Sequence, residues 1–120
     1  MRSTWIEHKG KRILYQNFSG NFYNSTAVKE ELEQVLKIVL AEPLNSVRVL
    51  SDFRDTNVGT DLLTPMNNAS AATKAHVNKT AVLGVTGMKR KLADLLTALT
   101  GQPLKYFDNI EAARDWLAED

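Results

Sequence analysis

The stretch Thr80-Ala81-Val82-Leu83-Gly84-Val85-Thr86-Gly87 runs directly into Met88-Lys89-Arg90-Lys91. The unbroken apolar character of residues 80–85 is typical of a strand that is buried on both faces of a parallel sheet. Apolar residues then recur at helical spacing, namely Leu92, Leu95, Leu96 and Leu99, and Gly101 and Pro103 close the segment. The sequence here predicts a strand followed by a helix, the unit from which parallel sheets are built.

Three cations, Lys89, Arg90 and Lys91, stand where this helix is expected to begin. A helix N-terminus carries a partial positive charge, so each cation there costs about 0.3 to 1 kcal/mol. The unpaired amide N–H groups of a helix start also bind phosphate and carboxylate groups. The arrangement therefore predicts an anionic ligand or an acidic partner at this point of the fold.

The first half of the chain reads as a hairpin, a helix and a strand. Residues 5–7 and 11–18 are rich in aromatic and β-branched residues and flank the turn His8-Lys9-Gly10. A helical stripe follows, with Asn24 or Ser25 as its cap, Glu42-Pro43 as its end and Val28, Leu32, Val35, Leu36, Val39 and Leu40 as its members. The next strand opens at Val47-Arg48-Val49-Leu50 and finishes near Asp52-Phe53.

The second half adds two helices and one strand to the strand–helix unit. The helix before that unit begins either at Thr60 with Asp61 or at Thr64-Pro65, and a polar connector, residues 54–59, precedes it. Residues 104–107 form the last strand. Asp108-Asn109-Ile110-Glu111 looks like a capping box, with Asp108 as the cap of a final helix that buries Ile110, Ala113, Trp116 and Leu117.

The predicted order of elements is β-β-α-β-α-β-α-β-α. Strands that alternate with helices imply right-handed crossovers, so we expect one α/β domain over residues 1–120 with a mostly parallel sheet and an N-terminal hairpin. No internal repeat or linker divides the 120 residues.

Composition narrows the classes of function. A net charge of +1 argues against general nucleic-acid binding, and the absence of cysteine removes disulfides, thiol catalysis and thiolate metal sites. No apolar run is long enough for a signal peptide or a membrane span, so a cytoplasmic protein is expected. We see no catalytic pair, metal-ligand spacing or cofactor motif, and therefore expect no enzyme, no metal and no cofactor.

The phrases Val47–Thr56, Thr80–Gly87 and Phe107–Leu117, together with the order of elements, resemble the SpoIIAA-like family of small bacterial proteins, relatives of the STAS domains. The resemblance implies a regulatory or binding role. In anti-sigma-factor antagonists of the STAS class, a serine in Asp-Ser-Ser/Thr-Gly at the start of the helix after the third strand is phosphorylated. The matching place here reads Gly59-Thr60-Asp61-Leu62, so Thr60 is the candidate phosphorylation site, although the preceding acid and following glycine are missing; the alternative is that Thr60 only caps the helix.

The candidate site gathers at the carboxyl ends of the third and fourth strands, where open parallel sheets bind ligands. Its members are Arg54, Thr56, Thr60, Thr86, Gly87, Lys89 and Lys91. Alternatively, Arg54 pairs with a neighbouring carboxylate and the cations face solvent. Two functions follow: a non-enzymatic domain that docks a protein partner or itself through the edge with Thr60 and the second helix, or a domain that binds a nucleotide, a phospholipid headgroup or a carboxylate, as in Sec14-like relatives.

Overall fold

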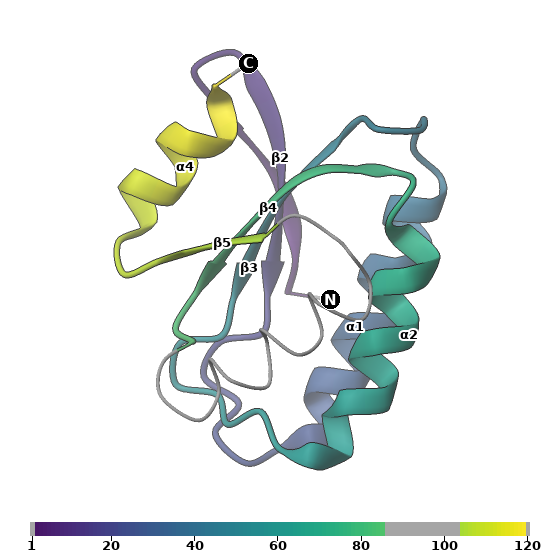
Figure 1. The fold of residues 1–120 in the computed structure, drawn as a ribbon. Coiled ribbons are helices and arrows are strands. Elements are labelled where there is room, and N and C mark those ends of the chain that lie inside the picture. The colour runs from purple at the N-terminus through teal and green to yellow at the C-terminus, as the bar shows by residue number, and fades with distance from the viewer. Residues whose placement is uncertain (1, 86–103, 120) are drawn as a thin grey trace.

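The computed structural model describes residues 2–85 and 104–119, which form one α/β domain with a mostly parallel, five-stranded sheet (Figure 1). Strands β1 (Thr4–His8) and β2 (Lys11–Asn17) make the expected hairpin, with Trp5 opposite Leu14. Lys9 and Gly10 both have positive φ, as a tight two-residue hairpin turn requires. The predicted hairpin is therefore confirmed, with β2 ending one residue before Phe18.

The other strands, β3 (Val47–Asp52), β4 (Val77–Leu83) and β5 (Leu104–Phe107), pair in parallel in the spatial order β1-β2-β3-β4-β5. The predicted start of β4 at Thr80 is three residues late. Residues 77–79 contain polar side chains, which hid them from an apolar pattern, but Val77 is paired with Val47 and Lys79 with Arg48.

Within residues 2–85 and 104–119, one face of the sheet is covered by two helices, α1 and α2 (Figure 1). Helix α1 (Ser25–Leu40) is capped by Asn24, whose side chain accepts a hydrogen bond from the Ala27 amide at 3.1 Å. Helix α2 (Leu63–Thr73) follows a short 3₁₀ turn, η1 (Thr60–Leu62). The two predicted starts thus mark successive parts of one segment: Thr60 opens the turn, and Thr64-Pro65 lies in the first turn of α2.

Helix α4 (Ile110–Ala118) covers the opposite face (Figure 1). The prediction that Asp108 caps it was wrong, because the Asn109 side chain accepts the hydrogen bond from the Ala112 amide at 3.0 Å. At its other end, Arg48 and Lys79 donate to the last carbonyls, including Glu119 O at 2.8 Å from each cation. Cations are favoured there by the helix dipole, so these contacts hold α4 to the sheet.

The core has a layer on each face of the sheet. Beneath α1 and α2, Phe18 and Phe53 stack with ring centroids 4.9 Å apart. On the other face, Leu50, Leu83 and Leu117 are almost fully buried. The predicted third helix, with its cations, lies outside the described residues.

Candidate functional site at the carboxyl edge

Strands β2, β3 and β4 all end at the same side of the sheet. We call the segments that follow them there, residues 18–24, 53–60 and 84–85, the carboxyl edge. Backbone hydrogen bonds join the first two of these segments, from Gly20 N to Arg54 O at 2.9 Å and from Phe22 N to Asp55 O at 2.8 Å. A third hydrogen bond between the same two segments runs from Asn57 N to Phe22 O at 2.6 Å. Two loops far apart in sequence are therefore held together as one surface.

An ion pair with a buried carboxylate lies at the end of β3. Asp52 ends β3 with its side chain fully buried, and the Arg54 side chain is 49% exposed. The carboxylate accepts hydrogen bonds from Arg54 Nε at 3.0 Å and Nη2 at 2.8 Å, and from the Tyr15 hydroxyl at 2.6 Å. The Arg54 amide adds a further bond at 3.0 Å. A buried carboxylate is stable only when it is paired in this way.

The network fixes the charge state of Asp52. Burial by itself would raise the pKa of the Asp52 carboxyl, but the hydrogen bonds from Arg54 and Tyr15 outweigh it and lower that pKa. Burial and the neighbouring carboxylate raise the pKa of the Tyr15 hydroxyl. Asp52 is therefore a charged anchor, and the alternative in which Arg54 pairs with a neighbouring carboxylate is the arrangement found.

Gly84, which lies within the stretch 80–87 that predicts the fold, is required by its backbone conformation and its close neighbours. Its φ is +79°, and a Cβ built there would lie 2.5 Å from the Arg54 amide nitrogen. No side chain fits at this distance. The segments leaving β3 and β4 can approach each other only because position 84 is glycine.

Thr56 is turned inward. Its side chain is almost fully buried, and its hydroxyl donates to Phe18 O and accepts from the Asn21 amide at 3.0 Å. This hydroxyl therefore ties the two loops together, and it does not present itself to a ligand at the surface.

Thr60 is exposed at the start of η1. The interpretation of Thr60 as a helix cap was wrong: the residue before the turn is Gly59, and no side chain caps it. Asp61 folds back close to Gly59, with its Oδ1 only 2.9 Å from where a Cβ of that glycine would lie. Three predicted site residues, Arg54, Thr56 and Thr60, thus lie at the carboxyl edge, while Thr86, Gly87, Lys89 and Lys91 lie outside the described residues.

The most exposed large apolar side chains of the carboxyl edge were not predicted as site residues. Phe22 is 63% exposed and Tyr23 is 84% exposed. Phe22 has a left-handed backbone, with φ +49°, which is uncommon for a bulky residue and is held here by the hydrogen bonds of the two loops. The only sequence signal was two aromatic residues inside the turn segment that precedes the Asn24 cap.

The fold agrees with a family assignment. The SpoIIAA-like family model matches residues 19–118, so the chain belongs to the SpoIIAA-like family. Domains of this STAS-like type are usually regulatory. Neither the curated proteins nor the solved structures contain a match to the chain.

Two properties of the described residues bear on the class of site. They contain no helix with the length and apolar character that a membrane crossing needs. No group of three or more histidine and acidic side chains within 2–85 and 104–119 is placed to hold a metal ion.

Proposed function

We propose that this protein is a non-enzymatic regulatory domain that docks a protein partner, or a second copy of itself, through the carboxyl edge. The observation that carries the proposal is the exposure of Phe22 and Tyr23, together with the left-handed backbone in which hydrogen bonds hold Phe22. Aromatic side chains dominate the energetics of protein interfaces. Backbone strain that the surrounding structure maintains is typical of functional sites.

The location of the aromatic pair supports the same proposal. The pair lies at the end of the sheet where η1 begins, and the Asn57 amide that bonds Phe22 O is three residues before Thr60. Phosphorylation of Thr60 would add a charge of about −1.5 to −2 beside Asp61, and a large hydrated group at the same edge as the proposed docking surface. We propose that Thr60 is the position at which such docking is switched off.

The alternative function, binding of a nucleotide, a phospholipid headgroup or a carboxylate at this edge, draws less support from the described residues. Arg54, the one cation of the predicted set among them, already gives two of its donors to Asp52. The Thr56 hydroxyl is used within the protein. An anion here would have to share Arg54 with a buried carboxylate.

Interaction capture from cell extract tests the proposal, with matched variants. Tyr23→Ser and Phe22→Asn remove the aromatic side chains, and asparagine tolerates a left-handed backbone. Leu44→Asn is the control, since Leu44 is 69% exposed at the opposite end of the sheet. We expect a stoichiometric partner, or self-association in sedimentation, that both edge variants lose and the control keeps. No stoichiometric partner and a strictly monomeric protein would contradict the proposal.

The role of Thr60 has its own test in the same assay. Thr60→Glu should weaken the captured interaction, whereas Thr60→Val, which keeps the size of the side chain, should leave it intact. Equal binding by Thr60→Glu and the parent would contradict a switch at this position, without bearing on the aromatic pair.

A further inference from the structure

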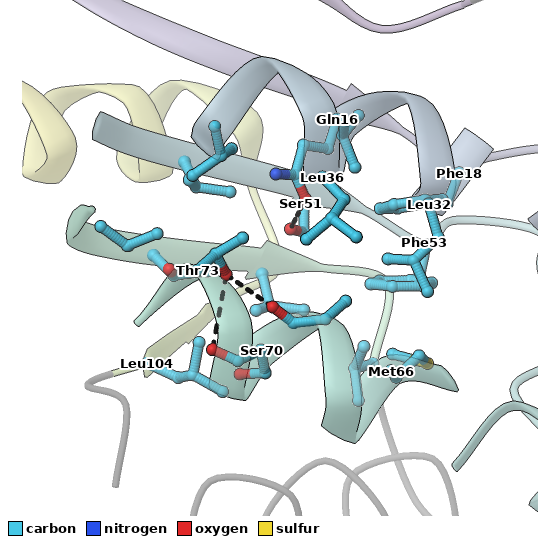
Figure 2. Close-up of a pocket in the computed structure, with 18 of the residues that line it drawn as sticks. Gln16, Phe18, Leu32, Leu36, Ser51, Phe53, Met66, Ser70, Thr73 and Leu104 are labelled. Carbon is cyan, nitrogen blue, oxygen red and sulfur yellow. Dashed lines mark hydrogen bonds between the residues drawn. The ribbon is translucent and has the colours of Figure 1, made fainter. Parts of the chain in front are cut away.

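A cavity of about 130 Å³ lies between the sheet and the two helices α1 and α2 (Figure 2). Protein interiors are normally packed as densely as organic crystals, with few voids larger than a water molecule. A cavity of about 150 Å³ accommodates one benzene ring. The space in this domain therefore has the size of a small organic molecule.

The wall of the cavity is mainly apolar. Leu32 and Leu36 of α1, Met66 of α2, and Phe18 and Phe53 at the ends of β2 and β3 line it (Figure 2). Two of the α2 residues that line the cavity, Ala69 and Ser70, have small side chains and leave room that larger side chains would fill. A surface of this kind favours apolar ligands, because they give up water at little cost.

Charge is absent from the described part of this wall. None of the described residues that line the cavity is Lys, Arg, His, Asp or Glu. An ion moved from water into such a site without a partner loses far more hydration energy than it regains. The cavity therefore suits a neutral molecule and discriminates against the anions expected at the carboxyl edge.

One polar group in the wall has hydrogen-bonding capacity to spare. Gln16 of β2 and Ser51 of β3 lie against each other, with Ser51 Oγ 3.0 Å from Gln16 Oε1. The Gln16 amide nitrogen donates no hydrogen bond to any described group, whereas the Thr73 hydroxyl is bonded to its own helix at Ala69 O, 2.8 Å away. With respect to the described residues, Gln16 thus has the N–H groups of its side-chain amide available to a ligand in the cavity.

We infer that the cavity between α1, α2 and the sheet is a binding site for a small, neutral, largely apolar molecule, about the size of one aromatic ring or a chain of about six carbons, with one hydrogen-bond acceptor for Gln16. The cavity shares Phe18 and Phe53 with the carboxyl edge, but Phe22 and Tyr23 do not line it, and the inference does not depend on the docking function.

The inference can be tested with probes of known chemistry. Methyl butanoate and pentanoate have the same number of heavy atoms, but the first is a neutral ester and the second an anion. Titrations of the full chain followed by NMR should show the ester perturbing the methyl groups of Leu32 and Met66, and pentanoate binding at least about tenfold more weakly. Equal binding of the two probes, or no binding of the ester, would overturn the inference.

Two alanines of α2 provide a matched pair of variants. Ala69→Leu adds three carbons inside the cavity, whereas Ala72→Leu adds the same atoms at an exposed position of the same helix. Ester binding should be lost in the first and kept in the second. Unchanged ester binding by Ala69→Leu would show that the ester binds elsewhere and would refute the site. If that variant does not fold, Val82→Ile narrows the same cavity from β4, and loss of ester binding is expected of it in the same way.

Discussion

The two ends of the sheet both expose large apolar side chains, yet they are built differently. The carboxyl edge exposes Phe22 and Tyr23, but it also contains an almost fully buried hydroxyl, Thr56, and adjoins a fully buried carboxylate, Asp52. At the opposite end, Leu44 is 69% exposed in a loop tied down by ordinary contacts, such as Asn45 N to Ala75 O at 2.8 Å. Burying polar groups is costly. At the carboxyl edge, the buried Thr56 hydroxyl joins the loop that carries Phe22 and Tyr23 to the segment after β3, and under the proposed function these two side chains form the docking surface.

The largest effect should come from the close approach of two segments at the carboxyl edge. Gly84→Ala introduces a Cβ about 2.5 Å from the Arg54 amide nitrogen and also a left-handed alanine, so we expect it to lower the free energy of unfolding by about 3 kcal/mol. Gly10→Ala is the control at the other end, since Gly10 has φ +80° but a methyl group added there would meet nothing within 4 Å. It should cost only about 1 kcal/mol. Equal losses in urea unfolding would mean that the approach at Gly84 is easily relaxed.

The ion pairs at the two ends give the next comparison. Asp52→Asn removes the charge that Arg54 and Tyr15 contact, and it should lower the free energy of unfolding by about 2 to 3 kcal/mol. The loss should not be larger, because the Arg54 side chain that stays behind can still reach water. Glu42→Gln breaks the Arg12–Glu42 pair at the opposite end, where Arg12 is 62% exposed, and should change stability by less than about 1 kcal/mol. Denaturant unfolding of both variants measures the difference. A neutral Asp52→Asn would contradict the anchoring role of this carboxylate.

Acid should lower the free energy of unfolding partly by protonating the Asp52 carboxylate. The folded-state pKa of Asp52 lies below the ordinary aspartate value of 3.8, so its contribution is fully present above that value and is lost as the pH falls through the lowered pKa. We therefore expect unfolding free energies measured between pH 5 and pH 2, near the range in which aspartates titrate, to fall less steeply in Asp52→Asn than in the parent. Glu31, whose pKa is also lowered against the effect of its burial by hydrogen bonds from Ser3 and Arg2, should keep part of the slope in the variant. Identical slopes would remove Asp52 from this account.

The smallest expected effect concerns the left-handed residues at the two ends of the sheet, Phe22 and Asn45. Phe22→Gly relieves a left-handed phenylalanine and should raise stability by up to about 1 kcal/mol, since glycine adopts this backbone without steric cost but is more disordered when unfolded. Asn45→Gly, at φ +55°, should gain less, because asparagine tolerates this conformation. Thermal unfolding compares the two. A loss of stability in Phe22→Gly would show that the ring itself stabilises the fold.

Most of the fold could be predicted because it depends on local patterns. The apolar residues of 80–83 and of 47–50 identified the central strands, and the stripe from Val28 to Val39 identified α1. The errors arose where neighbours compete or where polar residues carry the pattern: Asn109 rather than Asp108 caps α4, and β4 includes Asn78 and Lys79. The spatial order of strands depends on which edges meet in three dimensions, and the sequence pattern did not determine it.

The candidate site was predicted only in part. Strand ends pointed to the right edge of the sheet, and the proximity of Asp52 to Arg54 suggested a pair. The inward direction of Thr56 depends on a carbonyl 38 residues away, at Phe18, and the presentation of Phe22 depends on partners at residues 55 and 57. The cavity depends on how the volumes of side chains from two helices and the sheet add up. Such long-range relations are not visible in the spacing of residues along the chain.

Affinity for the captured partner, or for a second copy of the chain, tests the central claim most directly. We predict that Tyr23→Ser raises the dissociation constant by about 30-fold, equivalent to about 2 kcal/mol for an aromatic residue central to an interface. Leu44→Ser, the matched loss of an exposed apolar side chain at the other end of the sheet, should change the dissociation constant less than about threefold in the same calorimetric titration. Equal affinities of Tyr23→Ser and the parent, or a larger loss in Leu44→Ser, would contradict docking through the carboxyl edge.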